Sequence, residues 1–314
     1  MRSVQRALRE RAPGRSNGSG KLADVPDELS FFTAPDDVAI RLAYNVLLSR
    51  EPDEGGARDF ARVLGGDPSK RGAMLDWIRG SEEFAGRQFS TLGPSIHYGR
   101  GCFVRSLPPA RRILDLGGSS HTNAAGGLVG FGYPYAFDET IVVDLPSHER
   151  HSLYRDRSDT APARDEVVTR LGVVRYRYHS MVDLSGLDDE SFDLVYSGQS
   201  IEHVTADEAD VVLKEVARVL KPGGVLAVDT PNAAVCRLQQ AELIDPDHKV
   251  EYTAGELDAK LAASGFDVIE RKGLNYAGAS VASGAFDAID TAKHWGLYAE
   301  PEDCYLLAYV ARRR

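Results

Sequence analysis

Four side chains in the second half of this chain are of the types that bind divalent metal ions. Gln199, Glu202 and His203 follow an apolar stretch that has the composition of a buried strand. If a helix begins near Ser200, the i, i+3 and i+4 spacing places all three side chains on one face of it. A carboxamide, a carboxylate and an imidazole would then form three corners of a metal site. His248, in the sequence Asp-His-Lys, would supply the fourth.

Such a group of side chains suits a reaction on a hydroxyl group. A sugar or aliphatic hydroxyl is a poor nucleophile at neutral pH, so a general base or a metal ion must help it to lose its proton. A metal ion that bound two neighbouring hydroxyls would lower the pKa of one of them. Without an ion, His203 or His248 would act as the general base. The residues alone leave both interpretations open.

These side chains need a scaffold that brings distant segments to one edge. From about residue 111 onward, strand and helix patterns alternate, which predicts an α/β fold with a parallel, doubly wound, Rossmann-like sheet. Seven strands are expected, at residues 112–115, 140–144, 173–178, 192–196, 225–229, 266–271 and 305–310, with helices at 206–220 and 254–264. Open sheets of this kind hold ligands at the carboxyl ends of their strands, which is where the strand before Gln199 ends.

Two segments precede the alternating region. Residues 1–29 are rich in Arg, Gly, Ser and Pro, so we expect a disordered arm. Residues 30–90 show helical periodicity and predict a small all-α module. The pattern Leu-x-Arg-Glu-Pro-Asp-x-x-Gly and a later Ser-Glu-Glu-Phe make this segment resemble a helical module of unknown function. That module is found in bacterial surface proteins and beside sugar-modifying enzymes.

A glycine turn follows the first predicted strand and indicates a nucleotide-like ligand. Gly117 and Gly118 let the backbone approach a ligand closely and present amide groups to it. Asp144 ends the second predicted strand, where an acidic residue accepts hydrogen bonds from a ribose diol in dinucleotide folds. The turn lacks the Gly-x-Gly-x-x-Gly spacing of an NAD enzyme, which disfavours that alternative.

Residues 111–271 resemble a class I S-adenosylmethionine-dependent methyltransferase. The matching sequences are Leu-Asp-Leu-Gly-Gly at 114–118, Val-Asp at 143–144, Asp-Glu-Ser-Phe-Asp-Leu-Val at 189–195, Glu-His-Val at 202–204 and Leu-Lys-Pro-Gly-Gly at 220–224. The resemblance implies a cofactor site formed by Asp115, Gly117, Gly118, Asp144, Ser180, Met181 and Ser197. Within it, Asp144 would bind the ribose, and Ser180 and Met181 would flank the adenine. The family's third glycine is absent, because Ser119 follows Gly118.

A second resemblance concerns the metal site. Some O-methyltransferases, including small-RNA 2′-O-methyltransferases, carry Glu-x-x-Glu-His after the fourth strand and a histidine in Asp-His-Lys-x-Glu-x-Thr after the fifth. There the four side chains bind a divalent metal that chelates a vicinal diol. Glu202, His203 and His248 match this pattern, and Gln199 replaces its first glutamate. A glutamine oxygen still binds a hard cation such as Mg²⁺ or Mn²⁺, although it carries no charge.

Composition limits the acceptor and the partners. A formal net charge of −10 disfavours a nucleic-acid partner, because affinity for phosphates comes mainly from Lys and Arg. The three cysteines show no CxxC spacing, which disfavours a disulfide framework or a thiolate zinc site. No apolar stretch approaches the roughly 18 residues of a membrane span, and no apolar region follows the basic start, so we expect a cytoplasmic protein without a membrane partner.

The sequence therefore predicts transfer of a methyl group from S-adenosylmethionine to a hydroxyl of a small polyhydroxylated acceptor. This acceptor would be a sugar, a glycoside or a glycan end, bound with a divalent cation in a domain of residues 91–314. An RNA 2′-O-methyltransferase, a natural-product O-methyltransferase with a histidine base and a decayed cofactor-binding scaffold remain alternatives. Residues 273–303 are too many for a hairpin loop and are expected to cover the substrate. This insert and the helical module are also the surfaces on which a homo-oligomer would form.

Overall fold

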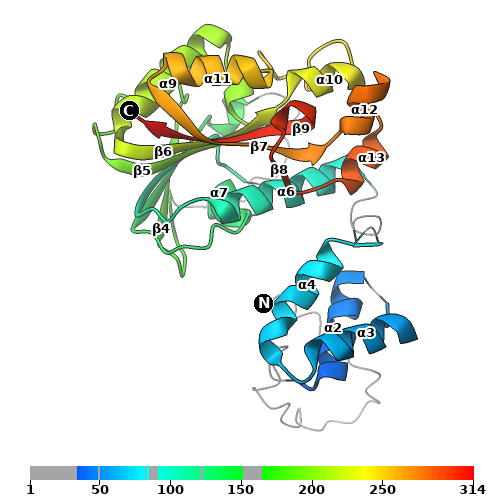
Figure 1. Cartoon of the computed structure of the whole chain (residues 1–314). Helices are drawn as coiled ribbons and strands as arrows, with labels where there is room; N and C mark the ends of the chain where they lie inside the picture. The colour runs from blue at the N-terminus through cyan, green and yellow to red at the C-terminus, as the bar shows by residue number, and fades with distance from the viewer. Residues whose placement is uncertain (1–33, 49, 82, 85–90, 121–122, 151–164) are drawn as a thin grey trace. The chain divides into compact units, whose positions relative to one another are not determined.

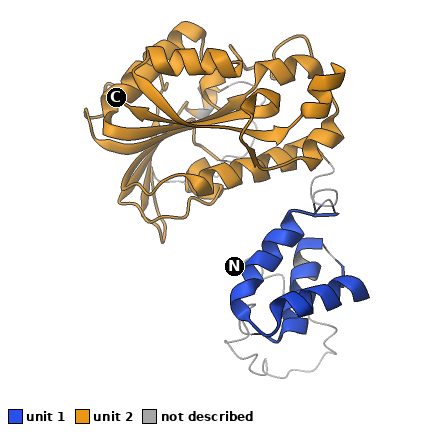
Figure 2. Ribbon diagram, in the orientation of Figure 1, with its two compact units in different colours: residues 1–90 blue, residues 91–314 orange. Residues whose placement is uncertain are grey.

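The computed structural model describes residues 34–48, 50–81, 83–84, 91–120, 123–150 and 165–314. The chain separates into two compact units, residues 1–90 and residues 91–314 (Figure 2). The predicted arm at residues 1–29 lies outside the described residues.

The described part of the first unit is helical. It contains α2 (Asp36–Leu48), α3 (Glu54–Leu64), the short turn η1 (Pro68–Lys70) and α4 (Arg71–Arg79). Asp53 begins α3 by accepting a hydrogen bond from the Gly56 N–H, and Gly65 ends it in a left-handed conformation (φ 55°). Arg50 pairs with Glu83, which connects the Arg-Glu-Pro-Asp segment to the Ser-Glu-Glu-Phe segment.

The second unit is built on one mixed sheet (Figure 1). Its strands are β1 (Arg112–Leu116), β2 (Glu139–Asp144), β3 (Glu166–Val168), β4 (Val173–Tyr178), β5 (Phe192–Gly198), β6 (Leu220–Pro231), β7 (Phe266–Tyr276), β8 (Leu297–Tyr298) and β9 (Cys304–Arg313). They are ordered β3-β4-β2-β1-β5-β6-β9-β7-β8. The strands from β4 to β6 are parallel, and β9 is antiparallel to both of its neighbours. The predicted Rossmann-like α/β fold is confirmed, although the sheet is mixed rather than wholly parallel.

The predicted number of seven strands is wrong for the described sheet, which has nine. The two additional strands, β3 and β8, lie at its edges and are three and two residues long. Segments this short are below the length at which an alternating apolar pattern can be recognised. The seven predicted strands correspond to the other seven, of which β6 and β7 are the most extended beyond their predicted bounds.

Helices bury both faces of the sheet. They are α6 (Leu92–Ser106), α7 (Gly126–Gly130), α9 (Ala206–Val219), α10 (Ala233–Gln239), α11 (Ala254–Ala263), α12 (Gly278–Ser283) and α13 (Ala288–Lys293). α9 and α11 cover one face, and α6 and α7 cover the other (Figure 1). Successive residues of β1 show this division, because Leu114 belongs to the core under α9 whereas Ile113 belongs to the core under α6. Within the described residues, no helix has the length and apolar character needed to cross a membrane.

The carboxyl ends of the central strands meet at one edge. Leu116 pairs with Ser197 between β1 and β5, and Gly198 pairs with Asp229 between β5 and β6. The predicted insert at 273–303 begins within β7, which runs in the same direction as β6 because both are antiparallel to β9. The insert therefore leaves the sheet at this edge. It contains α12, α13 and β8, and its role as a substrate cover stays a prediction.

Candidate functional site

The segment after β5 differs from the predicted helix. Gln199 has a left-handed backbone (φ 54°), and its N–H donates to the Asp229 carbonyl of β6 (2.8 Å). A single turn, η3 (Ile201–His203), follows, and α9 begins only after Thr205. The prediction that Gln199, Glu202 and His203 share one face of an α-helix is therefore wrong. The hydrogen bond to β6 and the capping box at Thr205 together keep this segment out of a helix.

Glu202 is a fully buried carboxylate at the bottom of the site. Its Oε2 accepts a hydrogen bond from the Thr230 hydroxyl (2.9 Å), whereas its Oε1 has no hydrogen-bond partner among the described residues. Burial raises the pKa of Glu202, and the nearby His203 and His248 oppose this shift. A buried acceptor without a partner is uncommon in a native protein and is expected where a further group completes the site.

His248 reaches this carboxylate from the loop after α10. The Lys249 N–H donates to the Glu202 carbonyl (2.8 Å), which fixes the loop beside η3. The His248 Nδ1 lies 2.8 Å from Glu251 Oε1, and Glu251 also accepts a hydrogen bond from Arg237 (2.5 Å). A carboxylate accepts only, so Nδ1 carries the proton, and Nε2 remains available as a ligand when the ring is neutral. Burial alone would lower the pKa of His248, but the Glu251 hydrogen bond and the Glu202 charge raise it.

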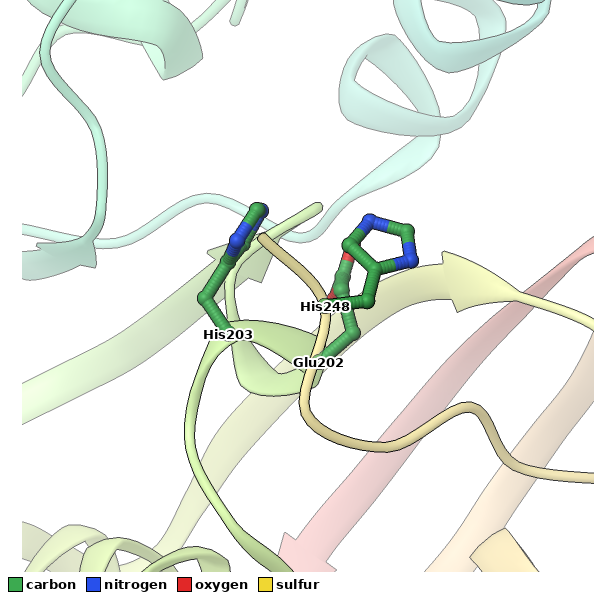
Figure 3. A group of neighbouring side chains, drawn as sticks. All are labelled: Glu202, His203 and His248. Carbon is green, nitrogen blue, oxygen red and sulfur yellow. The ribbon is translucent and has the colours of Figure 1, made fainter. Parts of the chain in front are cut away.

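His203 also lies beside an acidic residue. Its Nδ1 lies 3.0 Å from Oδ2 of Asp247, the residue directly before His248. The two imidazole rings are 5.0 Å apart and nearly perpendicular (81°). Figure 3 shows that His203 and Glu202 come from η3, that His248 comes from the facing loop, and that the three side chains lie side by side.

The three predicted ligands Glu202, His203 and His248 are thus brought together. One possible ligand atom of each lies within 4.8 Å of those of the other two. Ligands on opposite sides of an ion bound at about 2.1 Å are roughly 4 Å apart, so the spacing suits a first-row divalent ion after a small adjustment. Two imidazoles and one carboxylate, of which one oxygen has no hydrogen-bond partner in the described part of the chain, are a fitting donor set. Of the two expected ions, this set favours Mn²⁺ over Mg²⁺, because imidazole is a poor ligand for magnesium.

Gln199 is held differently from the other three predicted ligands. Its Nε2 donates to Asp229 Oδ1 (3.2 Å), and Asp229 also accepts hydrogen bonds from Arg100 and Tyr196. Burial raises the pKa of Tyr196 well above its usual value, so its hydroxyl remains a donor. Arg100 was not found by sequence reasoning, because it lies on α6, 129 residues before its partner. The sequence gives one indication that Asp229 belongs to the site, namely its position at the end of a predicted strand.

The glycine turn lies across the strand edge from these residues. Gly117 has a left-handed backbone (φ 67°), and a Cβ atom there would lie 2.6 Å from the Ser200 Cβ. A Cβ on Gly118 would lie 2.2 Å from the Asp115 carboxyl carbon. Asp115 itself is buried, accepts one hydrogen bond from the Leu128 N–H, and leaves Oδ1 unpaired among the described residues. Burial raises its pKa to about 7.

The other predicted cofactor residues lie along the same edge. Asp144 accepts hydrogen bonds from the N–H groups of Ser119 (3.0 Å) and Leu145 (2.7 Å). The Ser197 hydroxyl pairs with that of Ser200 (2.6 Å). Ser180 and Met181 form the turn after β4, where both are half-buried. Their contacts with a cofactor stay predictions.

Several contributors to the site were missed by sequence reasoning: Arg100, Thr230, Asp229, Asp247 and Glu251. Besides Asp229, only Glu251 and Asp247 had a usable signal, because they flank His248 within the Asp-His-Lys-Val-Glu-Tyr-Thr stretch. Hydrogen-bond partners of this kind are chosen by loop geometry, which spacing along the chain does not encode.

Residues 142–228, from β2 to β6, match a family model described as a methyltransferase domain. Two curated relatives are probable S-adenosylmethionine-dependent methyltransferases. The one from Mycolicibacterium smegmatis is 38% identical over 101 residues, which is 32% of this chain and 38% of that protein. The one from Mycobacterium tuberculosis is 40% identical over 88 residues, which is 28% of this chain and 31% of that protein. The chain thus spans about a third of the length of the curated relatives it matches.

Two solved structures are similar over about 70% of this chain. One, from Thermotoga maritima, is described as a possible histamine N-methyltransferase. It has a TM-score of 0.46 and 16% identity, and the match covers 70% of this chain and 89% of that one. The other is a small RNA methyltransferase with a TM-score of 0.46 and 19% identity, and the match covers 71% of this chain and 25% of that one.

Proposed function

We propose that the class I methyltransferase fold of residues 91–314 serves S-adenosylmethionine-dependent transfer of a methyl group to a hydroxyl. The acceptor would be a small polyhydroxylated molecule bound with a divalent cation. The family model that matches residues 142–228 and the methyltransferase relatives support the cofactor and the reaction class. The hydroxyl, the cation and the acceptor are inferred from the site itself.

The cofactor is assigned to the edge formed by β1, β2 and β5. Gly117 and Gly118 bring the backbone of the first turn close to its methionine half, beside Asp115. Asp144 is already fixed by the Ser119 N–H, so its carboxylate is oriented to accept the ribose hydroxyls. Ser180, Met181 and Ser197 are proposed to complete the site.

One observation carries the cation assignment: a buried glutamate and two histidines converge at the strand edge that also holds the glycine turn. Glu202, His203 and His248 would hold the ion, with the amide oxygen of Gln199 as a fourth ligand. Glu251 holds the His248 ring by a hydrogen bond, and Asp247 lies 3.0 Å from the His203 ring, so that little ordering of His248 is needed when the ion binds. A bound divalent cation would coordinate neighbouring hydroxyls and make one of them more acidic. Without an ion, His203 or His248 would serve as the general base.

A sugar-like acceptor fits this arrangement best. Vicinal diols suit chelation, and the formal net charge of −10 disfavours a long phosphate backbone. The resemblance of the helical module to modules beside sugar-modifying enzymes points the same way.

The test is a titration of the full chain with S-adenosylmethionine, with and without Mn²⁺, followed by methyl-transfer assays on matched acceptors. The panel pairs glycosides carrying a vicinal diol with their deoxy counterparts and includes RNA 3′ ends. We expect cofactor binding in either condition, and transfer to the diol glycosides alone when Mn²⁺ is present. Transfer to RNA ends only would contradict the sugar acceptor. Cofactor binding with no transfer to any acceptor would favour a binding scaffold.

A further inference from the structure

A buried charged network lies behind the proposed cation site. Asp229, which is fully buried near the end of β6, accepts hydrogen bonds from three side chains. The donors are Arg100 Nε at 2.7 Å, the Tyr196 hydroxyl at 2.5 Å and Gln199 Nε2 at 3.2 Å. The Arg100 guanidinium also lies over the Phe131 ring, 4.4 Å from its centre. A buried ion pair with this many partners fixes the groups that it contacts.

Asp229 accepts hydrogen bonds from both the backbone and the side chain of Gln199. Its main-chain carbonyl accepts the Gln199 N–H at 2.8 Å, and its carboxylate accepts the side-chain amide. Only the NH₂ group of an amide can face a carboxylate, so the Gln199 carbonyl oxygen is turned away from Asp229. The left-handed backbone at Gln199 (φ 54°) is unfavourable for a residue with a side chain, and these bonds to Asp229 compensate for it.

We propose that Arg100 and Asp229 are positioning residues that determine which side chain can stand at position 199. Arg100 holds the Asp229 carboxylate in place, that carboxylate takes a hydrogen-bond donor at position 199, and the carbonyl oxygen of this donor is then available as an uncharged ligand for the cation. The inference rests on the proposed function. It also accounts for the departure from the Glu-x-x-Glu-His pattern. A glutamate at 199 would replace the amide donor with a second carboxylate beside Asp229, so this hydrogen bond would be lost and two like charges would meet in a part-buried site.

The consequence is a cation site whose protein ligands include one carboxylate, Glu202, rather than two. Its net charge is set by a residue that does not itself touch the ion. A purely structural role for the Arg100–Asp229 pair makes a different prediction, since the cation affinity would then respond to position 199 independently of position 229.

The experiment measures Mn²⁺ affinity of the full chain without substrate, from the electron paramagnetic resonance signal of the free ion. Gln199→Glu tests the charge, Gln199→Met is the control that keeps the length and removes the amide, and a double variant combines Gln199→Glu with Asp229→Asn.

We expect Gln199→Met to weaken Mn²⁺ binding by about 10-fold. We expect Gln199→Glu alone to bind no more tightly than the wild type. The double variant should bind about 10-fold more tightly than Gln199→Glu, because the asparagine amide introduced at position 229 can donate to the carboxylate introduced at position 199.

Three results would overturn the inference. Tighter binding by Gln199→Glu alone would show that Asp229 does not restrict position 199. Unchanged binding by Gln199→Met would show that the carbonyl oxygen is not a ligand. A wild-type protein that binds no Mn²⁺ would remove the cation site of the proposed function itself. If the double variant does not fold, as a thermal melt would show, the comparison of the two single variants still decides. As a control, S-adenosylmethionine affinity should be unchanged in both single variants, which would show that the neighbouring cofactor site is intact.

Discussion

Each histidine of the candidate site lies beside a carboxylate. Glu251 holds His248 through Nδ1, and Asp247 lies beside the Nδ1 of His203. With the Nδ1 of His248 bound to Glu251, its Nε2 can act together with Glu202 Oε1, which has no hydrogen-bond partner among the described residues. His148 and His294 also lie near carboxylates, but both are exposed, so water would compete for any group that they bind.

Replacing His248 with alanine should separate catalysis from cofactor binding. We expect turnover to fall by more than about 100-fold, because the hydroxyl loses the group that helps it to release its proton. S-adenosylmethionine affinity should stay nearly unchanged, since the predicted cofactor residues lie along β1, β2, β4 and β5. Steady-state kinetics and calorimetry with the cofactor measure the two quantities. An active His248→Ala variant would exclude this group of residues as the catalytic site.

Asp115 should release a proton when the cofactor binds. Its pKa is about 7 in the folded protein against an ordinary value of 3.8, because burial disfavours the charged form. The stability that this group contributes is therefore present below about pH 4 and is lost as the pH rises to about 7. The cofactor carries an ammonium group, which would lower the pKa of Asp115 again.

The measurement is calorimetry at about pH 6 in buffers of different ionisation enthalpy. We expect the release of up to about one proton per bound cofactor in the wild type and less in Asp115→Asn. Equal proton release by the two proteins would show that Asp115 does not face the cofactor.

The connections after β5 and β6 decide how these residues meet. Pairing of Gly198 with Asp229 and the hydrogen bond from Lys249 to the Glu202 carbonyl place η3 against the loop of His248. The sequence predicted the strands that set this edge, because each carries an apolar run bounded by turn residues. It could not predict the left-handed Gln199, which depends on a hydrogen bond to a strand 30 residues away. Nor could it reveal Arg100 as the partner of Asp229.

The N-terminal cap of α11 ends the connection after β6, and its contribution to stability can be tested. Thr253, two residues after Glu251, begins α11: its side chain accepts a hydrogen bond from the Glu256 N–H. Thr253→Ala should lower the free energy of unfolding by about 1 kcal/mol. In a unit of this size, that corresponds to a melting temperature lower by roughly 2–4 °C. Thr205→Ala, which removes the equivalent capping box of α9, is the matched variant. Unchanged melting temperatures in both would show that these caps do not stabilise the fold.

The two units have separate cores. Both large apolar clusters of the described chain lie between residues 103 and 311, whereas the first unit buries its own residues, including Leu64, Met74 and Ile78. Every predicted cofactor and metal residue lies in the second unit. The sequence located the site in one domain because its motifs follow the strands of that domain. The sequence of the helical module contains no cofactor or metal motif of this kind.

A chain that begins at residue 91 should therefore fold and bind S-adenosylmethionine as tightly as the full chain. Circular dichroism and cofactor titration of the two proteins test this expectation. A shortened chain that folds but binds the cofactor at least about 10-fold more weakly would show that the helical module contributes to the site.

Methyl transfer in the presence of a chelator is the decisive measurement. The full chain is treated with EDTA and assayed with labelled S-adenosylmethionine on a glycoside that carries a vicinal diol, before and after addition of Mg²⁺ or Mn²⁺. The site of Glu202, His203 and His248 predicts no transfer in EDTA and recovery with the ions, with Mn²⁺ the more effective. Full activity in EDTA would contradict the cation site and leave His203 or His248 as a metal-free general base.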